Sequence, residues 1–270
     1  MRSTVLSLAL VGLLPPTGAA QTADEIIAKV LAARGGLDKI RDVQTERITG
    51  RISFGPDASG PFIAEFKRPL KMRMQLTVQN RTLVRVYDGE TGWANNPFAG
   101  QMLPETMGDE ELKAMAEEAD FDGPLVDYKE KGNKIELLGK DKFQNKDVWR
   151  LKVTTKKGDV RQYLYDSGSF LLLKWEGTRK FGGKEFPMQT YFRDYRDVEG
   201  LKFPFQMETG SSAANLSQKI SIENIELNPI LGDIEFGEPT APASAPSAPA
   251  AAPPAPPAPS QENPPEPGDP

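Results

Sequence analysis

The side chains that could carry out covalent catalysis are limited to a few kinds. The sequence of 270 residues contains no cysteine and no histidine, which rules out a thiol nucleophile, an imidazole base and a serine–histidine triad. It also rules out a zinc site built from the usual nitrogen and sulfur ligands. An enzyme with this sequence would depend on carboxylate, Ser/Lys or Tyr chemistry.

The remaining candidates for catalysis are better explained as turns. Residues 166–169, Asp-Ser-Gly-Ser, have the composition of a hairpin turn. Asp120, Asp122 and Gly123 lack the other ligands of a calcium loop. There is no glycine-rich phosphate loop or dinucleotide fingerprint, and no spacing identifies a facing pair of carboxylates. We therefore expect no catalytic residue, no metal site and no cofactor, and a protein that is not an enzyme.

The first 20 residues differ in composition from the rest of the chain. Arg2 precedes an apolar run of about 10 residues, Val5 to Leu14, and small residues end the segment at Ala20. This order predicts a secretory signal peptide, residues 1–20, cleaved after Ala20. The alternative is an uncleaved anchor, although a membrane span needs about 20 apolar residues. No cysteine comes after the run, so the chain is not itself a lipoprotein, and the predicted location is the bacterial periplasm or cell exterior.

The last 32 residues, 239–270, hold 13 of the 24 prolines, with Ala and Ser between them and few charges. Such a segment cannot bury enough apolar surface to offset its ordering entropy, so we expect a disordered Pro/Ala-rich tail. Residues 21–238 are then the folded domain. The net charge of −5 argues against nucleic acid as a partner, since binding a duplex requires a basic face. Nothing in the sequence demands more than a monomer.

The folded domain is predicted to open with a helix and to continue as strands. Thr22 and Glu25 have capping-box spacing, a helical apolar period comes next, and Gly35-Gly36 ends the run. A short second helix is expected over 37–41. A third, over 109–119, interrupts the strands. Alternation and turn residues predict about 11 strands: 44–54, 61–68, 70–79, 82–88, 134–139, 147–155, 159–166, 169–177, 186–196, 202–208 and 217–227.

These elements define a mainly β (α+β) fold. Strands in hairpin succession without long crossover helices form an antiparallel sheet, and a large sheet curls. We expect a curved half-barrel of about 11 strands with the few helices in its concave mouth. The helix over 109–119 would be either a mobile lid or a fixed plug, and its glutamates, Glu110, Glu111, Glu117 and Glu118, are predicted to form a solvated face.

Four short motifs occur in an order typical of one family. They are Gly35-Gly36-Leu37 after the opening helix, Val86-Tyr87-Asp88-Gly89 with Gly92-Trp93, Tyr163-Leu164-Tyr165-Asp166, and residues 192–204 with Tyr195, Gly200, Leu201 and Pro204. Over about residues 22–238 the chain resembles the LolA/LolB-like superfamily of periplasmic lipoprotein carriers. The resemblance implies a half-barrel with a helical lid over an apolar cavity, binding of acyl chains and no enzymatic activity. It also implies a buried arginine that holds the closed state, for which Arg51 and Arg85 are the candidates.

Strand 70–79 supplies the clearest candidate lining for such a cavity. Met72, Met74 and Leu76 alternate with polar residues, and methionine adapts to ligands of irregular shape. Lys71 and Arg73 would lie on a solvated convex face. The full set predicted to bind the ligand is Phe62, Phe66, Met72, Met74, Leu76, Val84, Val86, Trp93, Leu112 and Met115. The alternative is that these residues fill a dry core.

Three functions remain open from the sequence. The first is a periplasmic carrier for the acyl chains of lipoproteins or other lipids, acting in outer-membrane lipoprotein sorting. The second is an envelope sensor module of the same fold, and the third is a secreted carboxylate-dependent hydrolase. The expected partners are lipid acyl chains or lipoproteins, with transient contacts to membrane-bound donor and acceptor proteins.

Overall fold

The computed structural model describes residues 21–239, except 56–57, 182 and 214–215. The predicted signal peptide and almost all of the predicted tail lie outside these residues. Among the described residues, no helix is both long and apolar enough to span a membrane.

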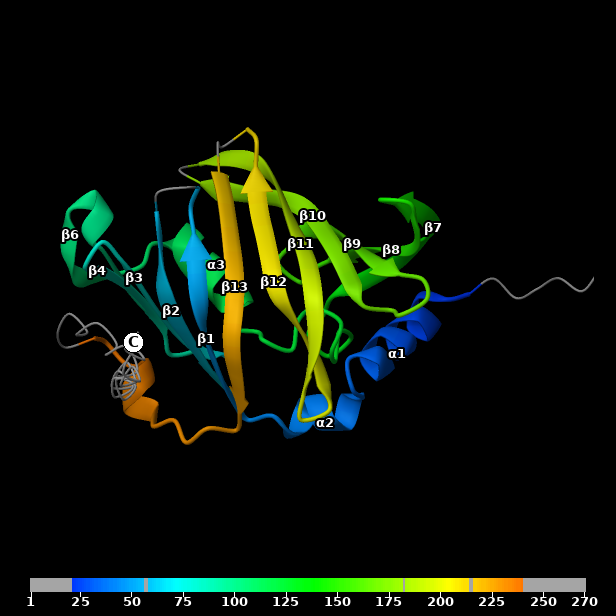
Figure 1. Cartoon of the computed structure of the whole chain (residues 1–270), viewed down its shortest axis with the longest axis horizontal. Coiled ribbons are helices and arrows are strands. Elements are labelled where there is room, and N and C mark those ends of the chain that lie inside the picture. The colour runs from blue at the N-terminus through cyan, green and yellow to red at the C-terminus, as the bar shows by residue number, and fades with distance from the viewer. Residues whose placement is uncertain (1–20, 56–57, 182, 214–215, 240–270) are drawn as a thin grey trace, which may run out of the picture.

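The described strands form one antiparallel sheet in which the first strand, β1, and the last, β13, lie side by side in the middle (Figure 1). Its order is β6-β5-β4-β3-β2-β1-β13-β12-β11-β10-β9-β8-β7. One arm contains β1 (Thr45–Ser53), β2 (Ser59–Lys67), β3 (Lys71–Val78), β4 (Arg81–Tyr87), β5 (Gly92–Asn96) and β6 (Gln101–Thr106). The other contains β7 (Lys134–Phe143), β8 (Lys146–Thr154), β9 (Val160–Asp166), β10 (Leu172–Phe181), β11 (Lys184–Val198), β12 (Leu201–Ser211) and β13 (Leu216–Leu227).

The half-barrel prediction is confirmed, and the sheet is larger than expected: it has 13 strands. The two additional strands are β5 and β6, at one edge. The sequence pattern does not reveal them because Pro97, Gly100 and Pro104 interrupt residues 92–106, and because the short 3₁₀-helix η1 (Pro97–Ala99) joins the two strands. Proline is tolerated at such an edge, where its missing N–H is not needed for pairing.

In the described part of the chain, three α-helices accompany the sheet: α1 (Ala23–Ala33), α2 (Leu37–Asp42) and α3 (Asp109–Glu118). The predicted capping box of α1 is present, with the Glu25 N–H donating to Thr22 Oγ1 at 3.2 Å. After α1, Gly35 has a φ of 122°, and a Cβ there would lie 2.3 Å from the Gly200 carbonyl oxygen. Glycine therefore lets α1 end directly against the β11–β12 turn.

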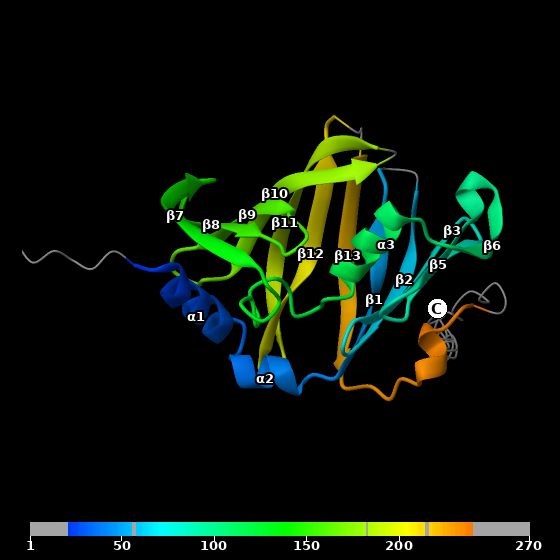
Figure 2. The same ribbon diagram turned by 180° about the vertical axis from the view of Figure 1, so that it is seen from behind.

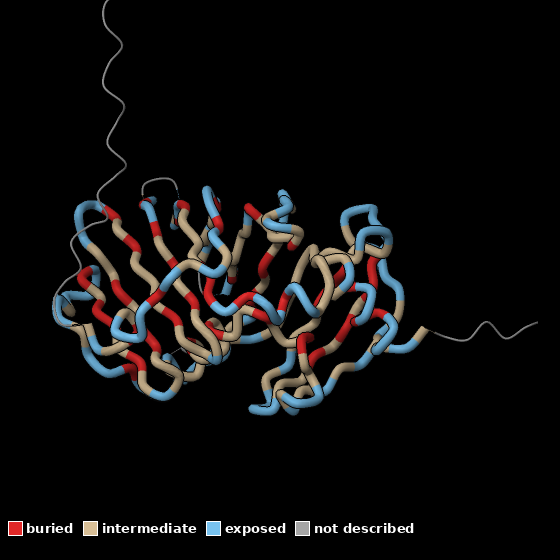
Figure 3. The backbone as a smooth tube through the Cα atoms, turned by 90° about the horizontal axis from the view of Figure 1, so that it is seen from below, coloured by how far each residue is buried: buried red, intermediate tan, exposed pale blue. Residues whose placement is uncertain are grey.

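Helices α1 and α3 and the segment after α3 cover the concave face of the sheet, and α2 lies at the lower end of the strands (Figure 2). Met115 and Ala119 are fully buried on Phe66, Met72 and neighbouring residues of β2–β4. On the other arm, α1 buries Ile26 and Val30 among the side chains of β8 and β9. Buried positions alternate with intermediate or exposed ones along many of the strands (Figure 3), as expected for a sheet with one covered face.

A C-terminal strap, residues 228–237, covers part of the opposite face. It includes the 3₁₀-helix η2 (Asp233–Phe236), and its Leu231 and Phe236 pack on Val84 and Val86 of β4. Lys67 Nζ donates to the Leu231 carbonyl at 2.8 Å. Lys71 and Arg73 lie on this convex face, as predicted, but they also contact the strap. Lys71 Nζ lies 2.9 Å from the Asp233 carboxylate, and Arg73 donates to the Glu235 carbonyl at 3.4 Å.

Candidate functional site

The concave face holds a cavity of about 320 Å³ between α1, α3 and the sheet, which we call the α1 cavity. Its lining comes from α1, β1, β2, β9, β10, β11 and β12, and from the segment 119–125 that comes after α3. Cavities of this volume are the usual size of small-molecule sites in proteins.

The walls of the α1 cavity are mainly aromatic and aliphatic. They include Phe66, Phe121, Phe170, Leu172, Phe192 and Phe203. Phe66 and Phe121 contact each other, with 5.9 Å between ring centroids. An apolar wall of this kind takes hydrocarbon out of water, which is worth about 0.8 kcal/mol per buried methylene.

One carboxyl group reaches this cavity from the middle of the sheet. Glu46 of β1, paired with Phe66 of β2 and Leu227 of β13, is only 4% exposed. Burial raises its pKa from 4.5 to about 7, although the positive charge of Arg34 opposes the shift. No hydrogen bond joins its carboxyl to any residue that the structure describes.

Arg34, Tyr195 and Tyr165 are among the other polar side chains that line the same cavity. Arg34, which caps α1, donates to the Asp122 carbonyl at 2.8 Å. The Tyr195 hydroxyl donates to the Leu172 carbonyl at 2.8 Å. Tyr165 is 5% exposed, and its hydroxyl makes no hydrogen bond within the described chain. Burial raises the pKa of Tyr165 well above its usual value.

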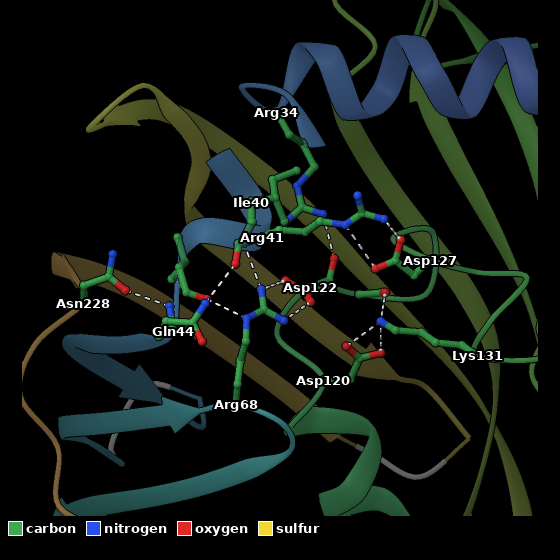
Figure 4. Close-up of polar contacts among 12 residues, drawn as sticks. Arg34, Ile40, Arg41, Gln44, Arg68, Asp120, Asp122, Asp127, Lys131 and Asn228 are labelled. Carbon is green, nitrogen blue, oxygen red and sulfur yellow. Dashed lines mark hydrogen bonds and ion pairs between the residues drawn. The ribbon is translucent and has the colours of Figure 1, made fainter. Parts of the chain in front are cut away.

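Ion pairs fix the segment 119–125 over the cavity (Figure 4). Arg68 donates to both Asp122 carboxylate oxygens, at 2.5 and 2.8 Å, and to the carbonyl oxygens of Val43 and Ile40. Lys131 lies 2.6 Å from Asp120. The segment is therefore anchored both to the α2 region and to the loop before β7.

Helix α3 is held by pairs to both arms of the sheet. Glu118 contacts Arg85 of β4 at 2.9 Å and Arg179 of β10 at 3.2 Å, while Glu117 pairs with Arg161 of β9. Burial alone would raise the pKa of Glu118, but the two guanidinium groups outweigh it and hold the pKa below its usual value.

These ion pairs bear on two sequence predictions, one about the glutamates of α3 and one about the candidate arginines. Glu110 and Glu111 are exposed, as predicted, but Glu117 and Glu118 are not a solvated face: both point toward the sheet. Of the two arginine candidates, Arg51 is exposed and Arg85 is the half-buried one that contacts α3.

A second cavity, of about 480 Å³, lies beside α3, and we call it the α3 cavity. It shares Gly123, Pro124 and Tyr163 with the α1 cavity. Its edge carries Lys156 and Lys157, both exposed. The segment 119–125 therefore separates two hollows of one concave face.

The structure separates the predicted ligand-binding residues into three groups. Phe66 lines the α1 cavity. Phe62, Met72, Leu76 and Met115 are buried beneath or within α3, and Met74 and Leu112 are half-buried beside them. Val84, Val86 and Trp93 lie on the opposite face, under the C-terminal strap, so the expectation that they share the concavity is wrong. Whether the second group contacts a ligand stays a prediction.

The aromatic wall on β9–β12 is absent from the predicted site. Its signal is present in the sequence, because Tyr163 and Tyr165 alternate on one face of a strand and Phe192, Tyr195 and Phe203 come in neighbouring strands. These positions enter the prediction only as motifs of the family resemblance, because the more regular alternation of β3 favours the other arm.

Comparison with known proteins supports the fold. No family model matches the sequence, and no curated protein matches it. A DUF1329 family protein from Desulfovibrio piger is similar in structure, with a TM-score of 0.55 and 14% identity over 81% of this chain and 98% of that one. A LolA superfamily protein from Nitrosomonas europaea is also similar, with a TM-score of 0.54 and 13% identity over 81% of this chain and 98% of that one.

A third similar structure is a putative outer-membrane lipoprotein-sorting protein domain from Vibrio parahaemolyticus. Its TM-score is 0.53 and its identity 14%, over 78% of this chain and 94% of that one. The chain therefore has a LolA-like fold.

Proposed function

We propose that this protein is a periplasmic, non-enzymatic carrier that binds the acyl chains of lipoproteins or other lipids in the α1 cavity. The observation that carries the proposal is the cavity itself, about 320 Å³ and walled mainly by aromatic and aliphatic side chains on the covered face of the sheet. Transfer of about 12 methylenes into such a wall releases on the order of 10 kcal/mol.

The predicted signal peptide and the LolA-like fold support the same function. Outer-membrane lipoprotein sorting, with transient contacts to membrane-bound donor and acceptor proteins, is the specific role that we propose for it. Met72, Met74 and Leu76 would join the ligand surface when α3 moves away from β3, since α3 now covers them.

A pair of adjacent substitutions tests the cavity. Leu172 lines the α1 cavity, whereas Leu173 lines a separate surface hollow beside Tyr191. Leu172→Trp should fill the cavity and weaken binding of a fluorescent acyl-ester probe about tenfold or more, because overlap with the ligand costs at least about 1.4 kcal/mol. Leu173→Trp is the matched control and should bind as wild type does.

Circular dichroism confirms that both variants are folded, and mass spectrometry of lipid extracted from the purified periplasmic protein shows what it carries. Equal probe binding by Leu172→Trp and wild type would place the ligand elsewhere. Failure of the wild-type protein to bind any acyl probe would remove the carrier function.

A further inference from the structure

The α1 cavity combines an apolar wall with polar groups that the described part of the fold leaves unpartnered. Glu46 and Tyr165 are at least nine-tenths buried, both line the cavity, and neither side chain makes a hydrogen bond to a described residue. Among the described residues, Arg161 Nε is the one fully buried side-chain polar atom without a partner. The free polar atoms of Glu46 and Tyr165 are therefore open to the cavity, where a ligand can complete their hydrogen bonding.

Arg34 interacts electrostatically with both of these groups. Its charge acts on the carboxyl of Glu46 and on the hydroxyl of Tyr165. Its guanidinium donates to the Asp122 carbonyl through Nη1, and a guanidinium has five N–H donors, so others are available to a ligand. An acceptor, a hydroxyl and a set of donors thus line one hollow whose walls are mainly apolar.

We infer that the α1 cavity takes a neutral, hydroxyl-bearing amphiphile with its polar head inward, hydrogen-bonded to Glu46, Tyr165 and Arg34. The inference rests on the proposed carrier function and names its ligand class. A hydroxyl group matches the cluster because it can donate to the Glu46 carboxyl while accepting from Tyr165 or Arg34.

Charge balance favours a neutral head over a carboxylate. The other charged residues that line the cavity are already paired: Asp122 with Arg68, Glu118 with Arg85 and Arg179, and Lys202 with Asp197. Arg34 and Glu46 are left to balance each other. Above about pH 7, where Glu46 is ionised, a fatty carboxylate would add a second anion beside one guanidinium, and burying an uncompensated charge is strongly unfavourable. The ligands are therefore compared at pH 8.

Three ligands with the same 12-carbon chain separate the possibilities: 1-monolauroylglycerol, methyl laurate and laurate. Each is measured by displacement of a fluorescent acyl probe from the full-length mature protein. The wild type should bind monolauroylglycerol about tenfold more tightly than methyl laurate, which has no donor for Glu46, and more tightly than laurate.

Two variants report on the polar head. Glu46→Leu removes the acceptor and should weaken the binding of monolauroylglycerol about fivefold. The affinity for methyl laurate should stay within about twofold of the wild-type value. Tyr165→Phe should also weaken the binding of monolauroylglycerol about fivefold, and this substitution breaks no hydrogen bond of the described fold. Tyr191→Phe, whose hydroxyl bonds Gln189 outside this cavity, is the control and should match wild type.

The outcomes distinguish failure of this inference from failure of the proposed carrier function. If all three ligands bind but Glu46→Leu and Tyr165→Phe change nothing, the head lies outside, and the inference fails while the carrier function stands. Tighter binding of laurate than of monolauroylglycerol would also overturn it. If the wild type binds none of the three, the inference falls together with the proposed function.

Discussion

Two glutamates on the concave face differ in what surrounds their carboxyl groups. Glu46 is buried without a hydrogen bond to any described residue, and burial raises its pKa to about 7. Glu118 lies between Arg85 and Arg179, whose charges outweigh burial and lower its pKa. The two carboxyls should therefore give the folding stability opposite dependences on pH.

Glu46→Gln should remove a loss of stability at high pH. The folded-state pKa of Glu46 lies above its ordinary value of 4.5, so its contribution is full below about pH 4.5 and is lost as the pH rises through about 7. From pH 4 to pH 9 wild type should lose about 3 kcal/mol relative to Glu46→Gln. Urea unfolding of both proteins across this range measures it, and parallel curves would contradict the buried, unpaired carboxyl.

Glu118→Gln should act in the opposite sense. The pKa of Glu118 is lowered in the fold, so its contribution is present above its ordinary pKa of 4.5 and is lost as the pH falls below that value. At pH 7 the variant should be less stable by about 1–2 kcal/mol, because partial exposure screens the two pairs. The same unfolding series at pH 7 and pH 3 tests this. Glu111→Gln, on the exposed side of α3, is the control.

At the scale of elements, the C-terminal strap explains why β4 is apolar on both faces. β4 pairs with β3 so that Val84 lies opposite Gln75 and Val86 opposite Arg73, while Tyr87 lies opposite Met72. Alternation within one strand assigns its residues to two faces. It does not show on which of these faces the apolar residues of the neighbouring strand lie. The sequence alone therefore could not separate Val84 and Val86 from the concave cluster, because the strap that covers them is distant in the chain.

Phe236→Ala tests the strap. The side chain of Phe236 is fully buried against Val84 and Val86, whereas Ile234 in the same turn is 89% exposed. Removing the ring should cost about 3–5 kcal/mol of unfolding free energy, and Ile234→Ala should be near neutral. Denaturant unfolding of the two variants gives the comparison; equal losses, or none from Phe236→Ala, would show that the strap does not stabilise the domain.

At the scale of the whole molecule, the chain path places the segment 119–125 across the concave face, where it lines the α1 cavity. The chain leaves the middle of the sheet through β1, reaches one edge at β6, crosses the concave face through α3 and the segment 119–125, and returns from β7 to β13. Strand alternation predicted most of this path. The cavity could not be predicted in the same way, since its lining joins α1, β1 and β9–β12, which only the curvature and the crossing segment bring together.

Truncation after Glu238 should leave the domain intact. The strap ends at Gly237, whose N–H donates to the Ile234 carbonyl at 3.4 Å, and residues 239–270 are dominated by Pro, Ala and Ser. Fragment 21–238 should match fragment 21–270 within about 0.5 kcal/mol in thermal unfolding, the range of neutral surface changes. A fragment ending at Leu227 lacks the strap and should lose at least as much stability as Phe236→Ala. A large loss in 21–238 would show instead that the tail packs on the domain.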